Sequence, residues 1–362
     1  MIIGTKYWTY NEKRYIDAPN SGVKLKRIHD VNVVLNSLSQ RVLRRTVPDL
    51  VNKHVEMNWA TVNGYHFWNG VSDSWRPWVT SFEQPIPWNF EKVDPLAFLV
   101  RDECRAVFFR SEWTKRVSDK LLASDPRWRS ILNKSKVIYS PEVARCRGNL
   151  REKNQCIEFL FIGRDFFRKG GLETLRAFVK LNEQFKNARL TIISRLGTRD
   201  WPVDASVENV ATARKIISSS PGFVRHYEEV SHKTVYELIK ESHVGICASP
   251  QDALANSVAE FMGSGLPVLV TNVAALPEWI GADSGWCVNL PISEYGAIDR
   301  STDVRRGYVS SLLERGIFEN LVYICSNPEE INEKGRYALE RISKYHSPTQ
   351  IGMQFREVYS TF

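Results

Sequence analysis

The chain has 362 residues, 43% of them hydrophobic and 25% charged, a composition typical of globular proteins. A single core rarely grows this large, so two domains are expected, and no apolar run approaches the roughly 20 residues that a membrane-spanning helix needs. The first ten residues lack the basic-then-apolar layout of a signal peptide, and the six cysteines show no C-x-x-C spacing. We therefore expect a cytoplasmic protein.

The positive charge is concentrated in the first part of the chain. Residues 1–150 carry a net formal charge of +9, and residues 151–362 carry −1. A basic domain indicates an anionic partner, such as a membrane surface, a lipid pyrophosphate, an acidic glycan or nucleic acid, although a solubilising surface would give the same excess. The basic residues proposed for a cytoplasmic membrane face are Arg41, Arg44, Arg45, Arg101 and Arg105. No nucleic-acid-binding motif occurs, so nucleic acid is not expected as the partner.

The N-terminal part shows an α/β pattern from residue 61 onward. Thr61–Trp68 and Pro77–Phe82 have the composition of strands, and Ser111 begins a capped helical pattern that continues to Leu122. Residues 136–139 form another strand pattern. The polar, basic segment 144–155 has little periodicity and is interpreted as a linker.

The C-terminal part alternates short apolar strands with helical patterns. This alternation predicts a parallel sheet covered by helices on both faces. Strands are predicted at 157–162, 189–193, 243–248 and 267–271, and helices at 172–185, 207–217, 232–241 with Ser231 as N-cap, and from 257. From residue 328 the pattern predicts helices with a break near Ser347-Pro348.

Basic residues and glycines follow the first strand of this part. Gly163-Arg164 ends the strand, and Lys169-Gly170-Gly171 stands immediately before the next helix. Ligands of open α/β sheets bind beyond the carboxyl ends of the strands, where a helix N-terminus favours anions. Arg164 and Lys169 would add two positive charges suited to a diphosphate, although a surface turn with solvated bases would look the same.

A second pattern, Asp252-x7-Glu260, follows the strand predicted at 243–248. It predicts Asp252 on a loop and Glu260 about one turn into a helix that Asn256 and Ser257 would cap. The N–H groups of residues 256–258, Val258 included, would then face phosphate, and the two carboxylates would bind sugar and ribose hydroxyls. Solvated helix charges would give the same spacing.

Together with Gly265-Leu266-Pro267-Val268, these segments resemble the retaining glycosyltransferases of family 4 in the GT-B fold. The resemblance covers roughly residues 156–362. It implies two Rossmann-like domains that face each other across a cleft: an N-terminal acceptor domain over residues 1–150 and a nucleotide-sugar domain over 151–340. A C-terminal helix over 341–362 would pack back on the N-terminal domain.

The resemblance also implies roles for individual residues. Gly163, Arg164 and Lys169 would hold the donor diphosphate, and Glu260, the second acid of the family's E-x7-E motif, would bind the ribose. Asp252 stands where the family has its first Glu, beside the donor sugar, and would be catalytic. The change from Glu to Asp shortens the side chain by one methylene and puts the sugar preference in doubt.

Candidates on the acceptor side come from the N-terminal part. The family often has a His at the end of a strand that faces the donor sugar; here Glu83 follows Phe82 and is a candidate catalytic acid or base, although an ordinary loop carboxylate would look the same. His66 is a second candidate, although a His among aromatic residues is more often a core residue, and Gly22 could belong to a short glycine loop. Of the tryptophans at 59, 68, 75, 78 and 88, most are expected in the core, with Trp75 or Trp88 exposed to stack on a sugar.

The expected function is transfer of a sugar, with retention, from a nucleotide diphosphate donor to a glycan or lipid-linked acceptor. Surface polysaccharide or lipopolysaccharide assembly is the expected setting. No D-x-D motif occurs, so neither a metal nor a cofactor is expected. The alternatives are an epimerase or hydrolase of nucleotide sugars on the same fold, and a protein without activity that binds a glycan or nucleic acid.

Overall fold

The structure is a computed structural model that describes residues 1–6, 16, 22–43, 47–56, 61–145, 156–197 and 205–362. The chain divides into two compact units: residues 1–141 with 346–362 form unit 1, and residues 142–345 form unit 2. The sequence prediction places the boundary at 150 and the start of the final segment at 341. None of the described helices is long and apolar enough to cross a membrane.

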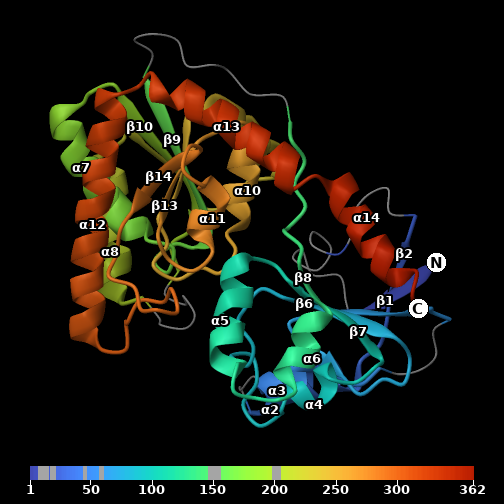
Figure 1. Cartoon of the computed structure of the whole chain (residues 1–362). Helices are drawn as coiled ribbons and strands as arrows, with labels where there is room; N and C mark the ends of the chain where they lie inside the picture. The colour runs from blue at the N-terminus through green and yellow to red at the C-terminus, as the bar shows by residue number, and fades with distance from the viewer. Residues whose placement is uncertain (7–15, 17–21, 44–46, 57–60, 146–155, 198–204) are drawn as a thin grey trace. The chain divides into compact units, whose positions relative to one another are not determined.

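Unit 1 is built on a six-stranded parallel sheet with the order β2-β1-β4-β6-β7-β8 (Figure 1). Its strands are β1 (Ile2–Thr5), β2 (Lys24–Arg27), β4 (Gly64–Trp68), β6 (Trp78–Phe82), β7 (Cys104–Phe109) and β8 (Ser135–Val137). The short strands β3 (Lys53–His54) and β5 (Val71–Ser72) pair separately. The helices are α2 (Val31–Leu43), α3 (Pro48–Asn52), α4 (Leu96–Leu99), α5 (Glu112–Leu122), α6 (Trp128–Asn133) and α14 (Pro348–Tyr359).

Helix α14 closes one of the two hydrophobic cores of unit 1. Its buried residues Phe355 and Tyr359 pack against Ile3, Val79 and Phe108 on the sheet. The last helix of the chain thus belongs to the same folding unit as the first strand (Figure 1).

Unit 2 contains a six-stranded parallel sheet with the order β11-β10-β9-β12-β13-β14. The strands are β9 (Ile157–Asp165), β10 (Ala188–Arg195), β11 (Val224–Tyr227), β12 (Val244–Cys247), β13 (Val268–Thr271) and β14 (Gly285–Val288). The helices are α7 (Gly171–Gln184), α8 (Val207–Ser219), α9 (His232–Glu241), α10 (Asn256–Gly263), α11 (Leu276–Ile280), α12 (Asp303–Ser326) and α13 (Glu330–Tyr345). Both units therefore have the Rossmann-like architecture that the sequence predicts.

Helices cover both faces of the unit 2 sheet. One core contains side chains of α7, α8 and α12, and the other contains side chains of α9, α10 and α11. Helices α7 and α12 lie side by side, and both begin near the carboxyl ends of the strands (Figure 1). Two of the predicted N-caps are confirmed: Ser111 accepts from the N–H of Thr114, and Ser231 accepts from the N–H of Thr234.

Candidate functional site

The order of strands in unit 2 reverses between β9 and β12. Strands β10 and β11 continue from β9 in one direction, and β13 and β14 continue from β12 in the other. The connections that leave the carboxyl ends of β9 and β12 therefore separate to opposite faces and open a crevice where ligands of such sheets bind. All the predicted donor residues lie in or next to these two connections.

Two glycines allow these connections to approach each other. A Cβ at Gly163 would lie 2.6 Å from Cδ of Lys169, so the glycine leaves room for the lysine side chain. Gly170 is the N-cap of α7 and has a φ of 75°, a backbone conformation that residues other than glycine rarely adopt. A Cβ there would lie 2.4 Å from the carbonyl oxygen of Ala248, at the end of β12.

Lys169 and Asp252 form an ion pair across the point where the strand order reverses. The Lys169 Nζ donates to Oδ2 of Asp252 at 2.8 Å, and the two side chains are only 14% and 11% exposed. Burial works against the charge of Lys169, but the carboxylate of Asp252 outweighs it and raises the pKa of Lys169. The structure thus brings together the predicted phosphate-binding cation and the predicted catalytic acid.

Two arginines flank this pair. Arg164 is exposed at the end of β9, and within the described parts of the chain its side chain makes no ion pair. Arg168, which the sequence analysis missed, donates from Nη2 to Asp165 at 2.6 Å and from Nη1 to the carbonyl oxygen of Gln251 at 2.9 Å. It ties the two connections together. The spacing Asp165-x2-Arg168 is a signal that could have revealed its first contact.

Buried hydroxyl groups donate hydrogen bonds to the backbone of both connections. Thr271, at the end of β13, donates to the carbonyl oxygen of Ser249 at 2.6 Å, where the Asp252 loop begins. Ser194, at the end of β10, donates to the carbonyl oxygen of Gly163. Both hydroxyl-bearing side chains are buried, so each fixes a backbone position of the site without being available to a ligand.

Helix α10 starts differently from the prediction. Its N-cap is Ala255, which has no capping side chain, so the prediction of Asn256 and Ser257 as caps is wrong: both lie inside the first turn. The side chains of Ser257 and Val258 are buried, and the N–H of Val258 donates to the carbonyl oxygen of Ala255 at 3.1 Å. Glu260 is partly exposed on the same helix.

In unit 1, Glu83 follows β6 directly, at the carboxyl edge of the sheet. Its carboxylate accepts from Nδ2 of Asn69 at 3.2 Å, and its own N–H donates to Oδ1 of that residue at 2.9 Å. Asn69 has a φ of 52° and follows β4. Thr114 of α5 donates to the carbonyl oxygen of Glu83 at 2.9 Å. Glu83 is thus a partly exposed carboxylate with a fixed backbone.

His66 lies in the core of unit 1, which corrects its placement at an acceptor surface. The ring is fully buried, and its two nitrogens contact the Tyr359 hydroxyl at 2.6 Å and the Ser81 hydroxyl at 2.7 Å. Burial, with a contribution from Arg110, lowers the pKa of His66 to about 3. A neutral ring with both nitrogens bonded has no capacity left for a substrate.

Gly22 is also misplaced by the prediction. It stands just before β2 and has a φ of 68°, so it lies at the amino end of that strand and not at the carboxyl edge of the sheet. Trp75 and Trp88 are 67% and 45% exposed, as expected. The expected core majority is not found among the described tryptophans of this stretch, because only Trp78 is buried and Trp68 is partly buried. Trp59 lies outside the described residues.

Trp88 shares the carboxyl edge of the unit 1 sheet with Glu83. It belongs to the connection after β6 and packs edge-on against Trp113 of α5, with ring centroids 6.0 Å apart. No cluster of three or more His, Cys, Asp or Glu side chains suited to a metal occurs among the residues with a described position.

Residues 145–295 match the family model described as glycosyl transferases group 1. Among solved structures, a glycosyltransferase from Rickettsia africae is 13% identical, with a TM-score of 0.58, 99% of this chain and 89% of that chain covered. Sucrose-phosphate synthase from Thermosynechococcus elongatus is 15% identical, with a TM-score of 0.55 and coverage of 82% and 73%.

The E. coli trehalose-6-phosphate structure bound with UDP-2-fluoro glucose is 13% identical, with a TM-score of 0.57 and coverage of 91% and 78%. At these identities the likeness shows the fold, which is GT-B with two Rossmann-like domains. A search among curated proteins gives no match.

Proposed function

We propose, on the premise that residues 145–295 belong to the glycosyl transferases group 1, that this chain transfers a sugar from a nucleoside diphosphate donor. The acceptor is a glycan or a lipid-linked glycan, in the assembly of a surface polysaccharide or lipopolysaccharide. One observation carries the proposal: the Lys169–Asp252 pair lies where the strand order of unit 2 reverses, beside the exposed charge of Arg164.

The opposite charges of Lys169 and Asp252 suit a reaction in which a nucleoside diphosphate leaves the sugar. As the bond between the sugar and the diphosphate breaks, negative charge grows on phosphate and positive charge grows on the sugar. Lys169 and Arg164 stabilise the phosphate, and the carboxylate of Asp252 lies 2.8 Å from the lysine, where the sugar would begin. Fixed charges that match the developing charge are typically worth a few kcal/mol each, about 2.7–4 in the best-studied cases.

The acceptor is assigned to unit 1. Glu83 and Trp88 lie at the carboxyl edge of its sheet, and they combine a partly exposed carboxylate with a partly exposed aromatic face. Such a combination binds sugar hydroxyls and stacks on sugar C–H faces. The net charge of residues 1–150 suits an acceptor that carries phosphate.

Peripheral association with an anionic membrane is part of this proposal. Helix α2 exposes four large apolar side chains on successive turns, together with the basic Arg41; they are Val34, Leu35, Leu38 and Val42. An exposed apolar stripe next to basic residues binds membrane interfaces. Flotation with anionic vesicles should be lost in Leu38→Asp and retained in Val207→Asp, an exposed position of unit 2. Equal flotation of both variants would refute the role of α2.

Retention of the anomeric configuration and independence of metal ions complete the proposal. Retention rests on the resemblance of the Asp252-x7-Glu260 segment to family 4. Metal independence rests on the absence of a D-x-D motif from the sequence and on the positive charges already placed at the phosphate position. Loss of sugar transfer on addition of a chelator would refute metal independence.

The test is a thermal-shift screen with UDP, GDP, dTDP, ADP and CDP. A ligand that binds only the folded state raises its stability in proportion to ln(1 + [L]/Kd). One diphosphate should stabilise the wild type and fail to stabilise Lys169→Ala and Arg164→Ala. No shift with any of the five would favour a protein that binds glycans without turnover. Conversion of the donor without an acceptor would favour an epimerase or hydrolase.

A further inference from the structure

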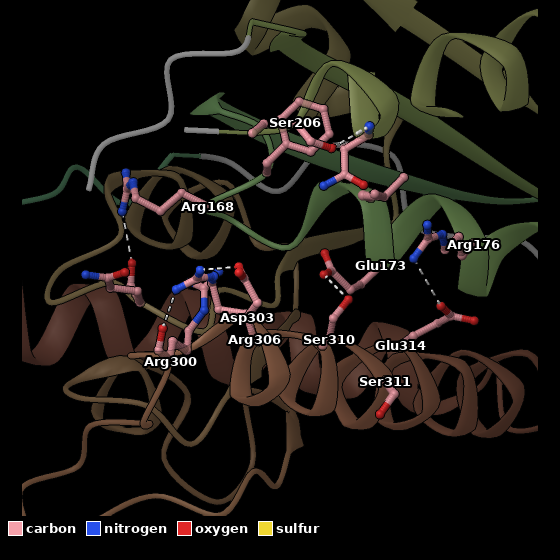
Figure 2. Close-up of a pocket in the computed structure, with 16 residues that line it drawn as sticks. Arg168, Glu173, Arg176, Ser206, Arg300, Asp303, Arg306, Ser310, Ser311 and Glu314 are labelled. Atoms are coloured by element: carbon pink, nitrogen blue, oxygen red, sulfur yellow. Dashed lines mark hydrogen bonds and ion pairs between the residues drawn. The ribbon is translucent and has the colours of Figure 1, made fainter. Parts of the chain in front are cut away.

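A second recess lies in unit 2, on the face covered by α7, α8 and α12. It is a pocket of about 630 Å³. Arg168 and Gln251 take part in lining it, but Lys169 and Asp252 do not. The pocket therefore adjoins the proposed donor site but does not include its ion pair. Figure 2 shows the residues that line the pocket.

Three helices begin at this pocket. Glu173 stands in the first turn of α7, Ser206 is the N-cap of α8, and Asp303 and Arg306 stand in the first turn of α12; all four line the pocket. The helices have 14, 13 and 24 residues. Each helix N-terminus carries a partial positive charge, so their convergence creates a positive potential.

Three guanidinium groups add to this potential. Arg168 is bound to Asp165, and Arg306 pairs with Asp303 and donates to the carbonyl oxygen of Arg300 at 3.0 Å. Arg300 differs from both: its Nε is buried without a hydrogen-bond partner, and within the described residues no carboxylate lies at ion-pair distance from it. Figure 2 shows the three side chains at one end of the pocket.

The charge of Arg300 is poorly compensated. Burial lowers its pKa; Glu173 counteracts this effect, while Arg306 and Arg168 lower the pKa further. A partly buried guanidinium beside two others raises the energy of the empty pocket. An anion placed among the three would remove that repulsion and gain charge-assisted hydrogen bonds.

Glu173 does not serve as a strong counter-ion. Its Oε1 accepts from the Ser310 hydroxyl at 2.6 Å, its Oε2 has no hydrogen-bond partner among the described residues, and burial raises the pKa of the carboxyl. A protonated carboxyl would donate from the unpartnered oxygen to an incoming anion. Glu173 can therefore take part in holding a phosphate.

We propose that this pocket binds a small organic phosphate, with the phosphate held among Arg168, Arg300 and Arg306. The organic part would lie against Phe167 and Leu172, which also line the pocket. A volume of about 630 Å³ suits a molecule of the size of a sugar phosphate. This binding goes beyond the proposed transfer reaction, because the donor diphosphate is assigned to Arg164 and Lys169, neither of which lines this pocket.

The test is calorimetric titration of the full chain with ribose 5-phosphate and inorganic phosphate, with ribose as the uncharged control. Wild type should bind the phosphates and not ribose. Arg300→Met should weaken binding by about tenfold or more, because it removes a charge-assisted bond. Arg315 is an exposed arginine in the middle of α12, and Arg315→Met should leave the phosphate affinity unchanged. Glu173→Gln, which keeps a hydrogen-bond donor at this position and cannot ionise, should keep or strengthen phosphate binding.

Three results would overturn the proposal. The first is equal affinity in wild type and Arg300→Met, and the second is no binding of either phosphate to wild type. The third is loss of phosphate binding in Lys169→Met with retention in Arg300→Met, which would place the probe in the donor site. Titration with a nucleoside diphosphate is measured separately in both variants, so failure of the donor proposal is distinguished from failure of this one.

Discussion

At the scale of single residues, the buried pair of Lys169 and Asp252 is expected to matter for stability as well as for ligands. Lys169→Met leaves a carboxylate that is only 11% exposed without its partner. Breaking such a pair typically costs about 3–5 kcal/mol. We expect a clear loss of stability in calorimetry and partial recovery when Asp252→Asn removes the stranded charge. A Lys169→Met variant as stable as wild type would contradict this interpretation.

His66 makes unit 1 sensitive to acid. Its pKa of about 3 in the folded chain lies below the ordinary value of 6.5, so the unfolded chain binds the proton first. The contribution of His66 to the free energy of unfolding is present in full above pH 6.5 and is lost as the pH falls toward 3. Between pH 7 and pH 5 this amounts to about 2 kcal/mol.

The measurement for His66 is denaturant unfolding of unit 1 at pH 7 and pH 5 in wild type and His66→Gln. The glutamine keeps polar atoms near Tyr359 and Ser81 but cannot be protonated in this range. The variant should lose less stability on acidification than wild type does. Identical pH dependence in both would show that the buried ring does not titrate as proposed.

The sequence predicted the residues whose role depends on their place at a strand end. Gly163, Lys169 and Asp252 meet because parallel strands bring their carboxyl ends to one edge. It misplaced His66, since burial of a side chain depends on α14 from the far end of the chain. It missed Arg300, whose surroundings come from segments distant in sequence.

At the scale of elements, the tight turn into α7 should tolerate no side chain at Gly170. Gly170→Ala would impose a φ of 75° on alanine and bring its Cβ to 2.4 Å from the carbonyl of Ala248. We expect a cost above about 1 kcal/mol and weaker diphosphate binding, because Lys169 adjoins the turn.

The matched control is Gly307→Ala in α12, where a Cβ meets no atom within 4 Å. Alanine there should stabilise the helix by roughly 0.5–1 kcal/mol. Calorimetry of Gly170→Ala and Gly307→Ala measures both changes in stability. Equal effects of the two substitutions would contradict the account of the turn.

Elements with a strong local pattern were predictable, and elements without one were not. Residues 232–241 were predicted as a helix and form α9 with the expected cap. The four-residue strands β12 and β13 were predicted because they lie in continuous apolar runs, whereas the equally short β11 mixes apolar residues with Arg225 and His226 and was missed. Helix α12 was missed although its buried residues Val309, Leu313, Ile317 and Leu321 recur every four positions, a pattern that could have revealed it.

At the scale of the whole molecule, the last helix should stabilise the unit that contains the first strand. Phe355 of α14 is buried between His66 and Phe108, with ring centroids 5.3 Å from each. Phe355→Ala typically costs about 3–5 kcal/mol at such a site. Amide hydrogen exchange should speed up in β4 and β7 and stay unchanged in β9 and β10 of unit 2. Loss of protection in unit 2 alone would contradict the division of the chain.

Local sequence patterns predict the two α/β parts but not the unit to which the last helix belongs. The two α/β parts could be inferred from alternating strands and helices, but nothing in residues 341–362 alone assigns α14 to unit 1. That expectation came from the resemblance to a family, because a contact between the two ends of a chain leaves no mark in short-range periodicity.

The central claim is that Lys169 recognises the diphosphate of the donor. The most direct measurement is calorimetric titration of wild type and Lys169→Met with the nucleoside diphosphate that the screen selects and with its nucleoside. Wild type should bind the diphosphate at least about tenfold more tightly than the nucleoside, and the variant should lose that advantage. A variant that still binds the diphosphate as wild type does would contradict the account.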